Sequence, residues 1–437
     1  MSRILRTKDK NFKTDFDNLL FQSRGDEKDI SQSVANIIKD VINQKNQAVI
    51  DFTTQFDNIT LSPNELEYSE NEIKSLINEV GSKERRALEV AAQRIRSFHI
   101  EQLPKDKFWT DLQGIELGWM WRPIARAGLY VPGGTASYPS SVLMNAIPAS
   151  IAGVKEIVMV SPTPNGRVNP LVLLAAKLAG VDRIYKIGGA QAIAALAYGT
   201  ETILKVDKIV GPGNAFVAEA KRQVFGKVGI DMVAGPSEVL IIADKANNPD
   251  WIAVDLLSQA EHDKSAQSIL VTTSEKFAGS VVKAVESRLH SLDRREIAQE
   301  SWRKNGIIIV TGNLSEAASL SDLVAPEHLQ LCVSEPEKLL NEINNAGAVF
   351  LGSWTPEAIG DYIVGTNHVL PTGGSARFSS GLSVLDFVKR TTVSKVTPES
   401  IIDIGIHATV LAKSEGLGAH ALSLMLRLDR AKTSVDE

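Results

Sequence analysis

Cysteine is nearly absent from this chain of 437 residues, in which Cys332 stands alone. A single cysteine excludes an intrachain disulfide framework and a cysteine-rich metal site. Basic residues are not in excess either, since 47 lysines and arginines face 52 acidic residues and leave a net charge of −5. That balance argues against general binding to the phosphates of nucleic acid. The composition therefore predicts a reduced, cytoplasmic protein with no nucleic-acid partner.

Long apolar runs are missing as well. The longest candidate, residues 141–154, is interrupted by Asn145 and Pro148 and falls short of the roughly 18 residues that span a bilayer. The first 17 residues mix Arg, Lys and Asp and contain no apolar stretch of the kind found in a signal peptide. Hydrophobic residues at 43% and charged residues at 23% lie close to the globular average. These features predict a folded, soluble protein without a membrane partner.

Helical periodicity dominates the first 120 residues. Val34, Ile37, Ile38 and Val41 recur at helical spacing within residues 30–56, and residues 71–99 repeat the pattern. The segment contains no glycine-rich turn that could hold a ligand. Residues 1–121 are therefore predicted to form a helical support or interface region.

The pattern changes at about Arg122, where short apolar runs begin to alternate with helical segments. Strands are expected in two series, at residues 157–160, 183–187 and 208–210, and then at 239–242, 269–271, 307–310 and 348–351. Continuous apolar strands separated by helices are typical of parallel sheets covered on both faces. The predicted fold class is α/β, with one parallel-sheet unit over residues 122–235, a second over 236–385 and a small C-terminal arm over 386–437.

Three glycine clusters follow predicted strands, at residues 132–135, 188–191 and 211–214. Glycine lets backbone N–H groups approach an anion, and the carboxyl ends of parallel strands are where such folds bind nucleotides. The chain contains neither an intact G-x-G-x-x-G nor a GxxxxGK[ST] motif. A nucleotide site and simple tight turns therefore both remain open as interpretations.

Candidate metal ligands and acid/base groups occur in two places. Gln259 and His262 lie three residues apart, so they share one helix face and can reach one ion, although a solvated helix end gives the same pattern. Glu327 and His328 are adjacent after Pro326, and a carboxylate beside an imidazole can serve as a general acid/base pair. A structural turn is the alternative for this second pair.

The remaining polar candidates are less specific on their own. Asp361 follows Glu357 by four residues, and Glu415 and His420 flank a Gly-Leu-Gly segment. No function is assigned to three further histidines, which are His99, His290 and His407. Cys332 lies in an alternating apolar run, which predicts a buried structural thiol rather than a catalytic one.

Taken in order, these motifs resemble the histidinol dehydrogenase family from about Arg122 to about Arg430. The segments that carry the resemblance are Gly128-Leu129-Tyr130-Val131-Pro132-Gly133-Gly134, Gly188-Gly189-Ala190-Gln191-Ala192-Ile193, Gly211-Pro212-Gly213-Asn214, Ala234-Gly235-Pro236-Ser237-Glu238, Gln259-Ala260-Glu261-His262-Asp263, Pro326-Glu327-His328-Leu329, Gly365-Thr366-Asn367-His368-Val369-Leu370-Pro371 and Glu415-Gly416-Leu417-Gly418-Ala419-His420. Many unrelated motifs in the right order are far more specific than any one of them.

The resemblance implies oxidation of L-histidinol to L-histidine in two NAD⁺-dependent steps, through a bound aldehyde, at the end of histidine biosynthesis. It implies one Zn²⁺ per site, with the ligands Gln259, His262, Asp361 and His420. The implied substrate contacts are Ser237, Gln259, His262, His328, Asp361, Glu415 and His420, and the implied NAD⁺ contacts are Tyr130, Gln191 and Asn214. Glu327 and His328 would be the catalytic acid/base pair.

The resemblance also implies an architecture of two incomplete Rossmann-like units with small arms that exchange in a homodimer. Residues 386–437 would then contribute to the active site of the partner subunit. Two other readings stay open, namely a relative that oxidises another small alcohol, such as a sulfonated diol, and a zinc hydrolase that needs no nucleotide. A hydrolase leaves the three glycine clusters unexplained, and a non-catalytic binding protein leaves the polar motifs unexplained.

Overall fold

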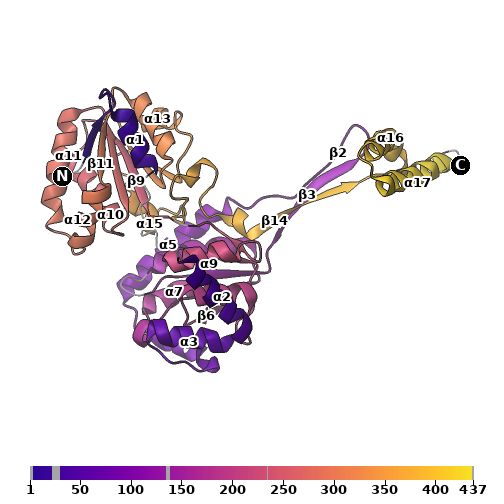
Figure 1. The fold of residues 1–437 in the computed structure, drawn as a ribbon, viewed down its shortest axis with the longest axis horizontal. Helices are drawn as coiled ribbons and strands as arrows, with labels where there is room; N and C mark the ends of the chain where they lie inside the picture. Colours follow the sequence, from indigo (N-terminus) through magenta and orange to yellow (C-terminus); the bar gives the residue numbers. More distant parts are fainter. Residues whose placement is uncertain (1–2, 22–29, 134–137, 234, 436–437) are drawn as a thin grey trace. The chain divides into compact units, whose positions relative to one another are not determined.

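The computed structural model describes residues 3–21, 30–133, 138–233 and 235–435 (Figure 1). The chain divides into two compact units, of which the first comprises Met1–Gln102 with Ile124–Phe387 and the second Leu103–Pro123 with Val388–Glu437. Gly134 and Thr135 of the first glycine cluster, and Ala234 of the motif before Ser237, lie outside the described residues. No helix within the described residues is long and apolar enough to cross a membrane.

A five-stranded parallel sheet forms one half of the first unit. Its strands, in spatial order, are β6 (Arg183–Tyr185), β5 (Glu156–Val160), β4 (Arg126–Tyr130), β7 (Lys208–Val210) and β8 (Gly229–Ile230). The chain adds β5 and β6 on one side of β4 and then returns to place β7 on the other side. The strand order therefore reverses between β4 and β7, and the carboxyl ends of these strands form the crevice where doubly wound folds bind ligands.

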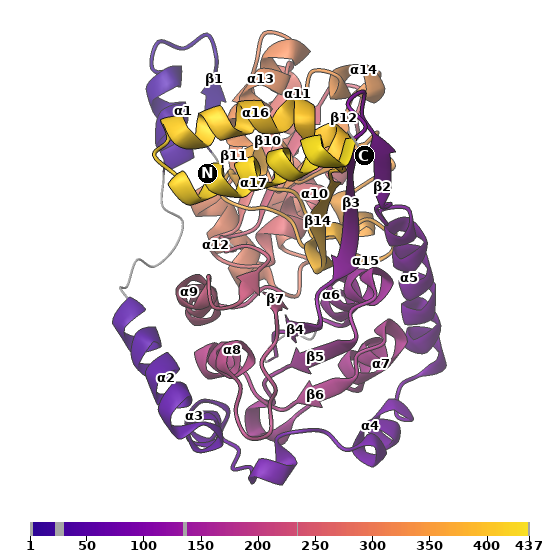
Figure 2. The same ribbon diagram turned by 90° about the vertical axis from the view of Figure 1, so that its right-hand side faces the viewer.

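Helices cover this sheet, and most of the N-terminal region contributes to them (Figure 2). Those formed by the sheet's own connections are α6 (Pro139–Ala152), α7 (Pro170–Ala179), α8 (Gly189–Tyr198) and α9 (Ala215–Val224). Those from the N-terminal region are α2 (Ser31–Gln44), α3 (Asn46–Asp57), α4 (Glu70–Ile77) and α5 (Ser82–Ile100). The apolar stripe of α2 is buried against α8 and α9, while α5 packs on α6 and α7. The N-terminal helices thus complete the core of the first sheet.

The second sheet of this unit is six-stranded and also parallel. Its strands, in spatial order, are β1 (Arg3–Arg6), β11 (Ile307–Val310), β10 (Gln267–Thr272), β9 (Glu238–Ala243), β12 (His328–Cys332) and β13 (Ala348–Leu351). Apart from β1, the strand order again reverses beside the first strand of the series, between β9 and β12. Two Rossmann-like sheets confirm the predicted α/β fold class. Strand β1 was not predicted, because a four-residue segment bounded by arginines shows no usable periodicity.

Both faces of the six-stranded sheet are buried. Alternate residues of β9 contact two different cores, with Val239 and Ile241 on one face and Leu240 and Ile242 on the other. The first face carries α10 (Pro249–Ala260), α11 (Glu275–Leu289) and α12 (Arg295–Asn305), and the second carries α1 (Phe12–Phe21), α13 (Leu314–Val324) and α14 (Pro336–Leu340). Burial on both sides explains why these strands appear in the sequence as continuous apolar runs.

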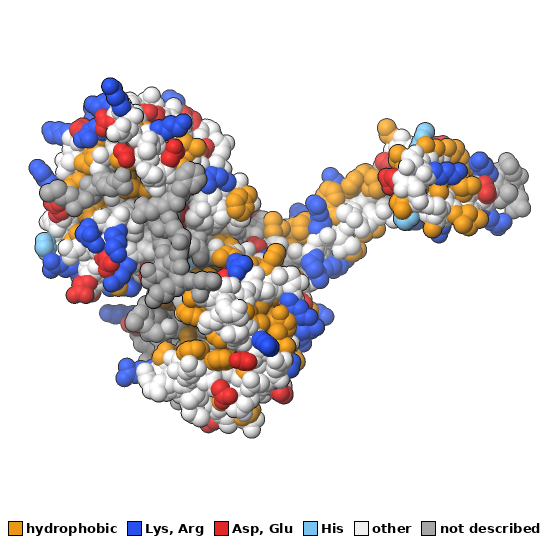
Figure 3. Space-filling model, in the orientation of Figure 1, with side chains coloured by type: hydrophobic (Ala, Val, Ile, Leu, Met, Phe, Trp, Pro, Cys, Tyr) orange, Lys and Arg blue, Asp and Glu red, His pale blue; other side chains and the backbone are white. Residues whose placement is uncertain are grey.

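The second unit has a different construction. Strands β2 (Lys107–Thr110), β3 (Glu116–Pro123) and β14 (Val388–Lys395) form an antiparallel sheet, and α16 (Pro398–Ser414) and α17 (Gly418–Val435) pack as a helical hairpin. Thr397 caps α16 by accepting a hydrogen bond from the Ser400 backbone N–H. Large apolar side chains, among them Leu411 and Leu426, are more than half exposed on the hairpin (Figure 3).

Candidate active site

Three predicted site residues lie at one edge of the six-stranded sheet. Ser237 immediately precedes β9 and Glu327 immediately precedes β12, and the two strands are parallel neighbours in which His328 stands opposite Val239. These residues therefore meet at the amino ends of their strands. Doubly wound folds usually bind ligands at the carboxyl ends, so this site departs from that rule.

His328 is held in one tautomer by the backbone. Its Nδ1 lies 3.0 Å from the carbonyl oxygen of Glu238, and because a carbonyl only accepts hydrogen bonds, Nδ1 carries the proton. The other ring nitrogen, Nε2, is buried and has no hydrogen-bond partner among the described residues. It faces Oδ1 of Asp361 at 3.7 Å. Burial lowers the pKa of His328, so the neutral ring presents a lone pair into the site.

Glu327 lies beside this imidazole, with Oε2 3.7 Å from Nδ1 of His328. Its carboxylate accepts a hydrogen bond from the backbone N–H of Glu238 at 2.9 Å and a second from the side chain of Ser237. Burial raises the pKa of Glu327 well above its usual value, and the negative charges of Glu238 and Asp361 act in the same direction. A carboxylate in this setting accepts a proton more readily than one in water.

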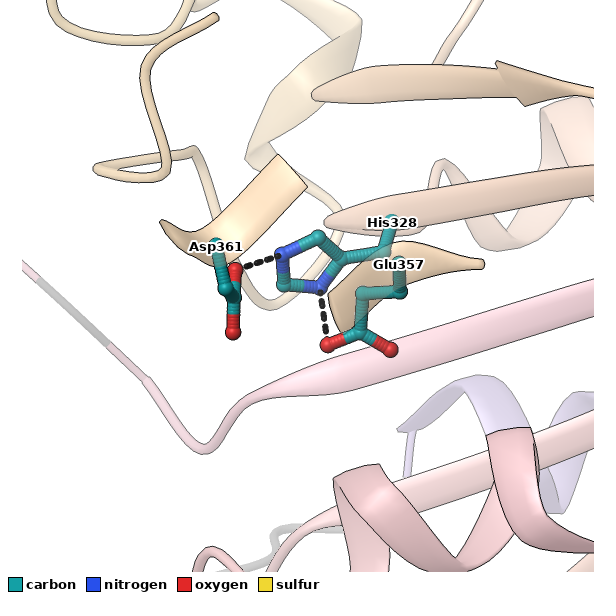
Figure 4. A group of neighbouring side chains, drawn as sticks. All are labelled: His328, Glu357 and Asp361. Atoms are coloured by element: carbon teal, nitrogen blue, oxygen red, sulfur yellow. Dashed lines mark ion pairs between the residues drawn. The ribbon is translucent and has the colours of Figure 1, made fainter. Parts of the chain in front are cut away.

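Helix α15 (Glu357–Tyr362) adds two carboxylates to the site (Figure 4). Glu357 and Asp361 are four residues apart and share one helix face. Oε1 of Glu357 lies 3.6 Å from Nδ1 of His328, and the ligand atoms of these three residues lie within 4.8 Å of one another. Glu357 is almost completely buried, which raises its pKa well above the usual value. Glu357 was not among the predicted site residues, and its spacing of four residues from Asp361 is the one signal for it in the sequence.

Gln259 lies in the last turn of α10, a helix that packs against α15. Its side chain is fully buried, yet neither atom of its amide has a hydrogen-bond partner in the described part of the chain. His262 follows in the turn after the helix, is exposed, and lies close enough for its charge to lower the pKa values of His328 and His368. A buried amide without partners is costly. The chemistry of Gln259, His262 and Asp361 fits a metal ion with nitrogen and oxygen ligands.

His368 is hydrogen-bonded to the backbone of Asp361. Its Nδ1 donates to the Asp361 carbonyl oxygen at 2.9 Å, and its Nε2 lies 3.3 Å from the Ser141 hydroxyl at the start of α6. His368 belongs to one of the motifs that carry the resemblance but was not among the predicted site residues. Its contacts hold the backbone of Asp361 in place, as groups that orient metal-binding residues commonly do.

The residues expected to contact a dinucleotide lie at the crevice of the five-stranded sheet. Tyr130 ends β4, and its hydroxyl accepts a hydrogen bond from the Gly189 backbone N–H at 3.1 Å. Gln191 lies in the first turn of α8, is buried, and its Oε1 has no hydrogen-bond partner within the described ranges. Asn214 caps α9 by accepting from the Val217 N–H. Tyr130 therefore lies at the carboxyl end of β4, while Gln191 and Asn214 follow the carboxyl ends of β6 and β7.

A buried ion pair fixes the loop after β7. Gly211 has φ +109°, and a Cβ there would lie 2.1 Å from the Tyr130 carbonyl oxygen, so glycine is required at this close approach. Lys221 and Asp231 form an ion pair that is almost fully buried. Lys221 donates to the Gly211 carbonyl oxygen at 3.0 Å, and Asp231 accepts from the Gly211 N–H at 2.8 Å. The backbone N–H and carbonyl oxygen of Gly211 are thereby both held in place beside Tyr130.

Glu415 and His420 belong to the second unit, unlike the other predicted site residues. Glu415 ends α16 and His420 lies in the first turn of α17, and both are exposed. Cys332, by contrast, is fully buried in β12, where the Gln330 amide nitrogen lies 3.1 Å from its sulfur. Burial raises the pKa of this thiol to about 12, which agrees with the predicted structural role.

Two Rossmann-like sheets, one of which carries a buried histidine among carboxylates, give the chain the architecture of an α/β enzyme. The chain matches the histidinol dehydrogenase family over residues 21–428. It is 62% identical to histidinol dehydrogenase of Cereibacter sphaeroides over 430 residues, which cover 98% of this chain and 99% of that protein. The corresponding protein of Rhodospirillum rubrum is 57% identical, with 95% and 96% covered.

A solved structure agrees with these relatives. The crystal structure of histidinol dehydrogenase from Elizabethkingia anophelis is 39% identical in sequence and superposes with a TM-score of 0.94, covering 99% of each chain. The chain therefore belongs to the histidinol dehydrogenase family, which is a family of oxidoreductases.

Proposed function

We propose that this chain oxidises L-histidinol to L-histidine in two NAD⁺-dependent steps, with L-histidinal bound between them, as the final steps of histidine biosynthesis. The names of the relatives support the substrate. The observation that carries the chemistry is His328, whose Nδ1 proton is fixed on a backbone carbonyl while Nε2 stays buried without a hydrogen-bond partner in the described part of the chain. Glu327 stands next to it as a second proton acceptor.

Zinc would be held by Gln259, His262 and Asp361, with His420 as the fourth ligand. The amide of Gln259 is buried and has no hydrogen-bond partner among the described residues. This supports the assignment, because a bound metal ion would give the amide oxygen a partner. When bound, the ion supplies a Lewis-acid anchor that fixes the amine and imidazole of the substrate. Ser237 and Glu415 would complete the substrate contacts, together with His328.

Proton transfer in this scheme is carried out by side chains of the protein. In the first oxidation, Nε2 of His328 would take the proton of the alcohol oxygen while a hydride leaves the carbon that bears this oxygen for NAD⁺. The resulting aldehyde must add water, because a second hydride can leave only from a tetrahedral carbon. Glu327 would accept a proton from that water while His328 returns its own proton to the carbonyl oxygen, so that Nε2 is free again to take a hydroxyl proton of the hydrate in the second oxidation. Each oxidation thus removes a hydride, which carries two electrons, from the substrate carbon and a proton from a hydroxyl group on that carbon.

Tyr130, Gln191 and Asn214 would bind NAD⁺ at the crevice of the five-stranded sheet. Their position after β4, β6 and β7 is where doubly wound folds place a dinucleotide. The ion pair of Lys221 and Asp231 would keep the loop that carries Asn214 in position, since it fixes Gly211 three residues earlier.

The active protein would be a homodimer with exchanged arms. The helical hairpin exposes several large apolar side chains, which are Val410, Leu411, Leu422 and Leu426. Monomeric proteins rarely leave a large apolar patch exposed to water. A second copy of the chain would cover this surface. The same exchange would bring Glu415 and His420 to the site of the partner subunit.

The test is to mix the purified protein with Zn²⁺, NAD⁺ and L-histidinol and to count NADH per histidinol consumed. Two NADH, abolished by a chelator and restored by Zn²⁺, is the expected result. One NADH would remove the aldehyde half of the scheme. No NADH from folded protein would favour a relative that oxidises another small alcohol.

A further inference from the structure

Asp57 lies at the carboxyl edge of the five-stranded sheet although it comes from the N-terminal helices. It is the last residue of α3, and its carboxylate accepts a hydrogen bond from the backbone of Thr163, which follows β5. The neighbouring side chains reinforce the contact, since Asn58 Nδ2 lies 2.9 Å from Asn165 Oδ1. Helix α3 therefore delivers a carboxylate to the end of the strand next to β4.

This carboxylate occupies an unfavourable place. Asp57 is 8% exposed, and its Oδ2 is buried with no hydrogen-bond partner in the described part of the chain. No ion pair joins it to a basic side chain among the described residues. It also stands at a helix C-terminus, where the helix dipole disfavours an anion. Burial accordingly raises the pKa of Asp57. A carboxylate at this position therefore contributes little to the stability of the fold.

Other unsatisfied polar atoms gather at the same edge. The hydroxyl of Thr163 and Oε1 of Gln191 are both buried without a hydrogen-bond partner within the described ranges. The loop of Thr163 packs tightly on the glycine clusters, because a Cβ on Gly188 would lie 2.4 Å from the Pro162 side chain. Tyr130 is close enough for the Asp57 charge to add to the effect of burial in raising its pKa to about 12. Polar groups from separate segments thus lie at the same edge of the sheet.

We propose that Asp57 binds the ribose hydroxyls of the adenosine half of NAD⁺ and selects NAD⁺ over NADP⁺, an inference that rests on the proposed function. In doubly wound folds, the carboxylate that binds this ribose stands at the end of the second strand of the series. Here that strand is β5, and the residues that follow it, Ser161 to Thr163, include no acid. Helix α3 supplies the missing carboxylate. The negative charge of this carboxylate would repel the 2′-phosphate of NADP⁺.

The test compares binding of NAD⁺ and NADP⁺ by calorimetry in the wild type, Asp57→Asn and Asp51→Asn. Asp51 is an exposed control on the same helix, where its carboxylate accepts from Gln47. Asp57→Asn keeps an acceptor for the Thr163 N–H but loses the charge. We expect it to bind NAD⁺ about tenfold more weakly and to discriminate less against NADP⁺. Histidinol binding and thermal stability should stay at the wild-type level, and Asp51→Asn should match the wild type throughout.

The outcomes separate this inference from the proposed function. A wild type that binds no NAD⁺ would overturn the proposed function itself. A wild type that binds NAD⁺, with unchanged affinity and unchanged discrimination in Asp57→Asn, would overturn the ribose assignment alone. If Asp57→Asn does not fold, the test uses the wild-type protein instead. Its affinity for NAD⁺ is then compared with its affinity for an NAD⁺ analogue that lacks the 2′-hydroxyl of the adenosine ribose. Weaker binding of that analogue supports the assignment, and equal binding overturns it.

Discussion

His328 and Glu238 are joined across two neighbouring strands, where the imidazole Nδ1 donates to the backbone carbonyl oxygen at 3.0 Å. The bond links the first residue of β12 to the first residue of β9. It fixes both the tautomer and the orientation of the ring and leaves Nε2 without a hydrogen-bond partner among the residues that the structure describes. A base that is already oriented before the substrate binds needs no rearrangement when the proton moves.

Replacing His328 by Asn should lower kcat in both oxidations by roughly 10²–10⁴-fold, the usual contribution of a general base. Asparagine keeps a donor for the Glu238 carbonyl oxygen but has no basic nitrogen. Stopped-flow measurement of NADH from histidinol and, separately, from histidinal checks both steps. His290→Asn is the control, since His290 is exposed at the end of α11. A loss in one step alone would show that His328 does not serve both.

Replacing Glu327 by Gln should slow the second NADH more than the first. The variant keeps an acceptor for the Glu238 N–H but cannot take a proton from water. In a single turnover, we expect the first NADH to appear at near the wild-type rate and the second after a clear lag. Glu335→Gln, an exposed change beyond β12, is the control. Equal slowing of both phases would refute this division of labour between Glu327 and His328.

The strands were the most predictable part of the fold, because burial on both faces leaves continuous apolar runs. The run at residues 157–160 is four of the five residues of β5, and 239–242 lies inside β9. Strand β1 escaped prediction because its pairing with β11 depends on tertiary contact rather than on its own pattern.

The site was predictable only where a residue belongs to a motif. Glu327, His328 and Asp361 stand in recognisable segments, and the structure brings them together. Glu357 acquires a role only when α15 packs beside β12. Asp57 and Thr163 are far apart in the sequence, and no local pattern links the end of α3 to the end of β5. Contacts made by packing between distant segments leave no periodic trace.

Gln259 and Gln330 provide a matched pair for the metal site. Both amides are buried, but Gln330 donates to Asp255 at 2.7 Å, whereas Gln259 has no partner among the described residues. Gln259→Leu should therefore leave stability unchanged or higher while zinc content falls. Gln330→Leu should cost about 1–3 kcal/mol of stability, because it leaves a buried carboxylate without its donor. Metal analysis and chemical denaturation separate the two effects, and a destabilised Gln259→Leu that retains zinc would contradict the assignment.

Cys332 should be dispensable for catalysis. With its pKa raised to about 12 by burial, only about one thiol in ten thousand is ionised at pH 8, since each pH unit below the pKa reduces the thiolate tenfold. The native protein should therefore resist a thiol reagent at pH 8 and react once unfolded. Cys332→Ala should retain near-normal turnover, with a modest loss of stability from the cavity. A loss of several orders of magnitude would indicate a thiol intermediate.

The exchanged arms predict complementation between two inactive variants. His328→Asn damages the body of the site, and His420→Asn damages the tail that lies in the second unit. If each site combines the body of one subunit with the tail of the other, a mixed dimer contains one intact site. Refolding the two variants together in equal amounts should then restore about a quarter of the wild-type activity, because half of the dimers are mixed. Each variant refolded alone controls for residual activity. No recovery, with mixed dimers demonstrated by a tag on one variant, would place the tail in the site of its own subunit.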